Sequence, residues 1–369
     1  MSSIPFYTPS PATQTSTPTP EKHLSQTSHK PGAGQNVAED LRAAVNGDTQ
    51  HRLNNTYSAS SSKLASGKEY NADNLARIIA TPTRSTEPFV SLRAVELNLP
   101  KGKIREGTEN GLSSSGIHPT WLENHGSLIG LNGAGVKLGG NQHDEVDNAG
   151  LIKGTTVALD MGGGNDKLMV RSGSRIEGLV DGGEGINGAY LDDHAGGTFN
   201  GASRMNLWVA KGEWALTGPI TNSTMNQVYS GATLINQSSI SGKTTVERGA
   251  IYSGGTADQL DVAGTLRMGP ATRIDKDLIM RAGSTLAFTA GADGTVSVGN
   301  TANLGGATLS IQVPDEHHLP SRPVRLLNAE RIEGQFANVT SNLKNLIPVL
   351  TYKSHDVFVT FKPKEPTPA

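Results

Sequence analysis

The feature that most restricts the fold is a short motif that recurs through the glycine-rich part of the chain. Only four of the 44 glycines precede residue 101, so the chain divides into two regions of different character. Two clear copies, at residues 124–129 (Asn-His-Gly-Ser-Leu-Ile) and 148–152 (Asn-Ala-Gly-Leu-Ile), place Asn-x-Gly before an apolar pair. Glycine opens a turn at low steric cost, and the apolar residues after it supply the inward side of a strand.

Later copies of the motif keep a glycine before a short strand. They lie at Gly231, Gly249, Gly264 and Gly283, at unequal steps along the chain. A strand that buries only one narrow face gains little stability alone, whereas stacked coils share a continuous core. Propeller blades need about 40 to 50 residues per repeat, and the strands of a β-sandwich do not usually recur with one turn motif. The repeat therefore predicts an all-β fold, a right-handed parallel β-helix over residues 106–313.

The central block and the end of the chain resemble one known family. Residues 158–185, which contain Asp-Met-Gly-Gly-Gly-Asn-Asp and Val-Asp-Gly-Gly-Glu-Gly, resemble the repeat block of bacterial autotransporter passenger domains of the pertactin-like type. Residues 198–218 are similar to the module that follows this block in the family. Residues 324–339 and 350–360 resemble the passenger's capping segment, which implies a cap over residues 314–362 and a tail over 363–369.

The first 105 residues have a different composition. Ser, Thr and Pro make up more than half of residues 1–30, and such a segment buries too little apolar surface to offset the entropy of ordering it. We therefore expect a largely disordered region with short helices at residues 37–46 and 72–79. Its start resembles the N-termini of type III secretion effectors, which implies an export signal; the alternative is a flexible tail. Residues 89–99 alternate as a strand, which either binds a secretion chaperone or begins the β-helix.

The signals of a self-exporting passenger are not visible in the sequence. Residues 1–30 lack the apolar core of a signal peptide, and the family's translocator barrel does not follow the cap. We therefore expect a passenger body that is secreted by a type III secretion system and, in one alternative, delivered into a host cell. The other explanation is a truncated autotransporter passenger. With 32 basic and 34 acidic residues and no run of about 18 apolar residues, we expect no nucleic-acid partner and no membrane span.

Three residue clusters are candidates for chemistry. Asp192, Asp193 and His194 form a compact cluster, and β-helix polysaccharide lyases or hydrolases use clustered carboxylates as acid and base. The other motifs of those enzymes are missing, so a solvated loop is favoured over a catalytic site. Asp166 lies in a Gly-x-Gly-x-Asp pattern that resembles a calcium-binding nonapeptide, but the next, degenerate copy starts only at Gly182, far beyond a nonapeptide step. The adjacent histidines at 317–318 would not share a strand face, so we expect neither metal nor cofactor.

Two tryptophans are the candidate binding residues. Trp208 and Trp214 could stack on sugars or anchor a partner if they are exposed on a face of the solenoid. Because Trp208 stands between Leu207 and Val209, the sequence favours a place for it in the core. Together these observations favour an interaction protein over an enzyme: a secreted, virulence-associated adhesin or effector whose partner is a host protein or a cell-surface glycan. A β-helix polysaccharide lyase or hydrolase remains the alternative.

Overall fold

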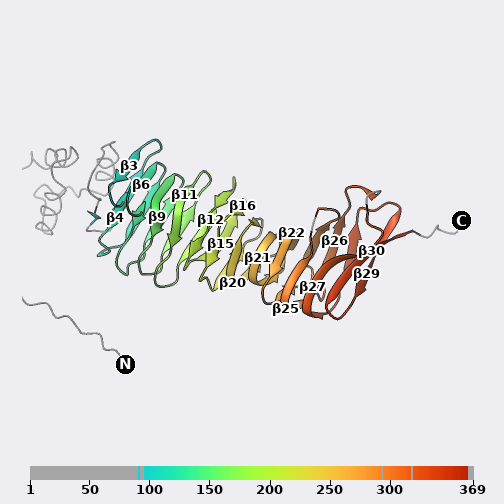
Figure 1. The fold of residues 1–369 in the computed structure, drawn as a ribbon. Coiled ribbons are helices and arrows are strands. Elements are labelled where there is room, and N and C mark those ends of the chain that lie inside the picture. The colour runs from blue at the N-terminus through green and yellow to red at the C-terminus, as the bar shows by residue number, and fades with distance from the viewer. Residues whose placement is uncertain (1–89, 92–94, 293, 317–318, 365–369) are drawn as a thin grey trace, which may run out of the picture.

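The computed structural model describes residues 90–91, 95–292, 294–316 and 319–364 of the chain. Within these ranges the chain is all β, without an α-helix, and its strands stack into an elongated parallel β-helix of about ten turns (Figure 1). The fold class predicted from the repeat is confirmed. The short helices expected at residues 37–46 and 72–79, the disordered region before residue 90 and the histidines at 317–318 lie outside the described residues.

Three parallel sheets run along the solenoid, and each coil contributes a strand to them. Sheet 1 contains β2 (Val95–Leu99), β5 (Thr120–Asn124), β8 (Glu145–Asn148), β10 (Lys167–Val170), β12 (Gly188–Asp192), β15 (Asn206–Lys211), β18 (Met225–Val228) and β23 (Leu278–Met280). The last parts of four longer strands complete it: β20 (Ser239–Val246), β21 (Ile251–Val262), β25 (Val296–Asn303) and β27 (Val324–Glu333).

Sheet 2 follows sheet 1 in each coil and consists of two series of pairings. The first series is β3 (Ile104–Gly107), β6 (Ser127–Gly130) and the starts of β9 (Leu151–Asp160) and β11 (Arg175–Asp181). The second is β13 (Gly197–Phe199), β16 (Glu213–Leu216), β19 (Thr233–Asn236), the starts of β21 and β22 (Thr265–Ile274), then β24 (Thr285–Thr289), β26 (Thr308–Gln312) and β28 (Asn338–Ser341).

Sheet 3 closes the cross-section. Its short strands are β1 (Val90–Ser91), β4 (Leu112–Ser114), β7 (Val136–Lys137), β14 (Ala202–Ser203) and β17 (Ile220–Thr221), and β9, β11, β20, β21, β22, β25 and β27 supply the rest. Near the C-terminus the pairing becomes antiparallel, because β30 (Asp356–Pro363) pairs with β27 and β29 (Leu346–Tyr352) pairs with β30. This hairpin lies in the segment interpreted from the sequence as the cap, except that β30 ends one residue beyond it, at Pro363.

The core consists of columns of equivalent side chains. Val146, Leu168, Ala189 and Leu207 stand opposite one another in β8, β10, β12 and β15, and all are buried. Their neighbours along each strand point outward because successive side chains of a strand alternate between its two faces. Parallel, in-register stacking therefore turns the repeat of the sequence into a continuous core and a continuous outer surface.

Buried asparagines join neighbouring coils inside this core. Asn124 and Asn148, the asparagines of the two clearest Asn-x-Gly copies, are buried, and Asn124 Nδ2 donates to Asn148 Oδ1 over 2.7 Å. Asn148 Nδ2 in turn donates to Ser174 Oγ over 2.6 Å in the next coil. Each amide oxygen also accepts the backbone N–H of the turn glycine two residues later. The motif thus builds the turn and joins neighbouring coils.

Candidate functional site

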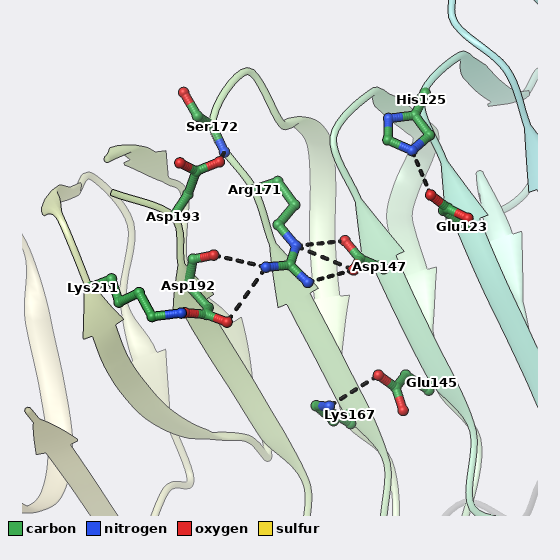
Figure 2. Close-up of polar contacts among 10 residues, drawn as sticks. All are labelled: Glu123, His125, Glu145, Asp147, Lys167, Arg171, Ser172, Asp192, Asp193 and Lys211. Atoms are coloured by element: carbon green, nitrogen blue, oxygen red, sulfur yellow. Dashed lines mark hydrogen bonds and ion pairs between the residues drawn. The ribbon is translucent and has the colours of Figure 1, made fainter. Parts of the chain in front are cut away.

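Polar and aromatic side chains gather on the outer face of sheet 1, over β5, β8, β10, β12 and β15. The strands lie in register, so Asp147, Met169, Tyr190 and Trp208 form one outward column. The charged residues of this face and of the loops that follow the strands are drawn in Figure 2. We refer to this region as the sheet 1 face.

Tyr190 and Trp208 form an aromatic stack on this face. Their ring centroids are 4.6 Å apart with an interplanar angle of 24°, and both side chains are partly exposed. The Trp208 ring lies close against Gly188, where a Cβ atom would stand 1.7 Å from Cζ3. Lys167 holds its ammonium group 5.6 Å from the centre of the Tyr190 ring, which favours a cation–π contact. The absence of a side chain at Gly188 is therefore what lets the indole lie flat.

An ion-pair network continues the sheet 1 face toward the loops (Figure 2). The Arg171 guanidinium donates to both carboxylate oxygens of Asp147, with distances of 2.6 to 3.1 Å, and to the backbone oxygen of Asp192 over 2.8 Å. Lys211 Nζ stands 2.8 Å from the Asp192 carboxylate, and Lys167 Nζ stands 2.9 Å from that of Glu145. The hydrogen bonds and charge of Asp147 raise the pKa of Arg171 despite its partial burial. The partners come from neighbouring coils, so the network connects these coils on the outer face of sheet 1.

The acidic cluster predicted from the sequence is already engaged by the protein. Asp192 pairs with Arg171 and Lys211, as described above. The carboxylate of Asp193 accepts the backbone N–H groups of Ser172 at 3.1 Å and Ala195 at 3.0 Å, and these hydrogen bonds lower its pKa. His194 is exposed. A general acid needs a carboxyl group that keeps its proton, and Asp193 has the opposite property.

Asp166, the residue of the calcium-like pattern, lies inside the coil. Its side chain is 3% exposed, and its Oδ1 accepts the backbone N–H of Asp144 over 2.9 Å. Burial, together with the charge of Asp144, raises its pKa to about 7. Among the described residues, no group of three or more His, Cys, Asp or Glu side chains is arranged to hold a metal ion.

One of the two tryptophans lies inside the solenoid and the other on its outer face. Trp214 is fully buried, and its Nε1 donates to the backbone oxygen of Lys211 over 2.7 Å, so this candidate binding residue is a core residue. The interpretation that Trp208 fills the core is wrong. Leu207 and Val209 point inward and are buried, and strand alternation places Trp208 on the outer face.

Sequence reasoning missed Tyr190, Arg171 and Lys167 as parts of this face. No motif singled them out, although Lys167 and Arg171 lie within the block at residues 158–185, and each is far in sequence from its partners. The signal that could have found them is the step between coils, because Glu145, Lys167 and Gly188 hold the same place in three successive coils. Applying such steps to outward positions places Tyr190 in one column with Asp147 and Met169, whereas the step from Tyr190 to Trp208 is shorter than these.

Comparison of the chain with family models, with curated proteins and with solved structures gave no match. Within the described part of the chain, no helix is long and apolar enough to cross a membrane. The β-helix is consistent with the passenger-like body that the sequence motifs resemble.

Proposed function

We propose that this protein is a secreted, virulence-associated bacterial interaction protein that binds a host protein or a cell-surface glycan through the sheet 1 face. The observation that carries this proposal is the partly exposed Tyr190–Trp208 stack, bordered by the ion pairs of Lys167 and Arg171. Aromatic and arginine side chains are the residue types that most often dominate binding surfaces. Their fixed positions also reduce the entropy lost on binding.

The arrangement of the acids favours binding over hydrolysis. A polysaccharide hydrolase needs one carboxyl group that stays protonated and one that stays ionised, both open to the substrate. On the sheet 1 face, Asp147 and Asp192 are paired with cations, and Asp193 accepts two backbone N–H groups. The two aspartates whose pKa values are raised, Asp144 and Asp166, are buried instead. The alternative of a β-helix polysaccharide lyase or hydrolase therefore has less support.

A binding experiment tests this function. The purified full chain is applied to a glycan array and to cultured host cells, alongside Trp208→Ala and Arg171→Ala. Arg273→Ala is the matched control, because Arg273 is an exposed, ion-paired arginine on β22 in sheet 3. We expect both sheet 1 variants to lose binding at least about tenfold, which corresponds to roughly 1.4 kcal/mol, while the control binds normally. Binding that survives both substitutions contradicts the assignment to this face.

The route of export is a separate part of the proposal and rests on the sequence. Residues 1–30 resemble a type III export signal, and a secretion chaperone is the expected partner of the N-terminal region. A reporter fused to residues 1–50 should leave the bacterium only when the type III apparatus is intact. Export that persists without this apparatus would contradict the proposed route and favour a truncated passenger.

A further inference from the structure

Two buried aspartates in neighbouring coils lie next to each other at the N-terminal ends of two strands of sheet 1. Asp144 and Asp166 immediately precede β8 and β10, and they belong to a column that runs from Thr120 through both aspartates to Asn187. The backbone N–H of each residue donates to the Oδ1 atom of the next one: Thr120 to Asp144 at 2.6 Å, Asp144 to Asp166 at 2.9 Å, and Asp166 to Asn187 at 2.8 Å. We call Asp144 and Asp166 the acidic pair.

The second carboxyl oxygen of each aspartate has no hydrogen-bond partner among the residues that the structure describes. Asp144 is 0% exposed and Asp166 3% exposed, and within the described part of the chain Oδ2 of both is buried without a donor. Asn187, which takes the same place in the next coil, shows that the column needs only one acceptor oxygen at each position. The negative charge of the pair is therefore not required to make the column.

The charged groups around the acidic pair compensate its negative charge poorly. His143 precedes Asp144, is exposed, and lowers the pKa of both carboxyl groups when charged. Glu145 and Lys167 follow the two aspartates, but their side chains are on the outer face and pair with each other at 2.9 Å. Glu184, in the loop of the next coil, is exposed and contacts Gly164 through its backbone oxygen. Burial therefore has the largest effect on the two pKa values, and ionising both carboxyl groups puts two like charges side by side inside the solenoid.

From this geometry we propose that the acidic pair makes the stability of the N-terminal coils depend on pH. The coils around β8 and β10 are held firmly while the pair carries protons, and they loosen when both carboxyl groups ionise. The element is built into the solenoid and acts independently of any ligand on the sheet 1 face.

The linkage between proton binding and folding sets the direction in which stability changes with pH. Burial raises the pKa of Asp144 to about 6 and that of Asp166 to about 7, against an ordinary value of 3.8. Between about pH 4 and pH 7 the folded chain thus binds more protons than the unfolded chain, so stability falls as pH rises through this window. For one such carboxyl group, the opening equilibrium constant rises by about tenfold to a hundredfold between pH 5 and pH 8.

Hydrogen–deuterium exchange of the full chain tests this proposal. Amide opening in β8, β10 and β12 is measured at pH 5, 6.5 and 8, after correction for the intrinsic effect of pH on exchange. We expect opening in the wild type to increase at least about tenfold across this range, and Asp144→Asn/Asp166→Asn to abolish most of the increase. Asp166→Asn alone is the second variant, and Asn187 shows that an amide fits this column.

Two further variants complete the design. Asp193→Asn removes an aspartate whose pKa is lowered, so it should leave the change between pH 5 and pH 8 as in the wild type. Asn187→Asp adds a third carboxyl group to the column and should steepen the dependence. Equal pH dependence in the wild type and in both Asp→Asn variants would overturn the proposal.

Discussion

Replacing Trp214 with alanine is expected to destabilise the middle coils far more than replacing Trp208 does, although the two tryptophans are close together in the sequence. Trp214 is the largest of the fully buried side chains, and its ring packs against Gly197 of the preceding coil, where a Cβ would lie 3.0 Å from Cζ3. Because Gly197 has no side chain, it cannot fill the cavity that the indole would leave. The substitution also removes the hydrogen bond to the backbone of Lys211.

These contacts set the size of the two effects. Removal of a buried tryptophan costs about 3 to 5 kcal/mol in local stability. Trp208 is partly exposed and mainly loses its stack on Tyr190, worth about 0.5 to 1.5 kcal/mol beyond its buried area. The two ranges differ by at least about 1.5 kcal/mol, which corresponds to a difference of about tenfold or more in the opening equilibrium constant.

Hydrogen exchange in β13, β16 and β19 is the suitable assay, because a solenoid opens coil by coil and a single unfolding midpoint averages over all coils. Trp214→Phe keeps most of the ring and should fall between the wild type and Trp214→Ala. Binding in the glycan and cell assays should follow the opposite order, with Trp208→Ala the more damaging. Exchange that is no faster in Trp214→Ala than in Trp208→Ala would refute the placement of the two rings.

Three further substitutions test other parts of the structure. Asn148→Ala removes one of the two acceptors of the buried Asn124 amide and leaves the backbone oxygen of Leu151, so denaturation should show a loss of about 2 kcal/mol. Burial opposes the ionisation of Asp261, but the hydrogen bonds and charges of its two cationic partners, Lys243 and Arg281, lower its pKa. Its contribution to the free energy of unfolding should therefore be present above the ordinary carboxyl pKa and disappear as pH falls below about 4. Acid unfolding of Asp261→Asn should lack this component. Gly188→Ala places a Cβ 1.7 Å from the Trp208 ring, so the near-ultraviolet circular dichroism of the stack should change while the far-ultraviolet spectrum is kept.

The local pattern of the sequence was sufficient to predict the coils. Asn124 and Asn148 begin turns that contain a glycine, and the apolar pair after each turn supplies one buried residue, Leu128 or Ile152. These are short-range properties, since a turn or an alternating strand depends on only a few neighbouring residues. They are enough to specify a stacked β fold without any information about distant contacts.

The outer face of the solenoid could not be predicted in the same way. The step along the chain from Tyr190 to Trp208 is shorter than the step from Glu145 to Lys167, because the loops of successive coils differ in length. The side of the wall that Trp208 occupies also depends on the phase of β15, and a shift of one residue would turn it inward.

The sequence by itself thus determined that this chain forms stacked β coils with glycine turns, because these features are local. Only the tertiary structure decided that Trp208 faces outward on Tyr190, that Arg171 joins Asp147 to Asp192, and that Asp144 lies buried above Asp166. Those contacts arise from the register between coils. Register is fixed by the packing of the whole core, not by any one segment of the chain.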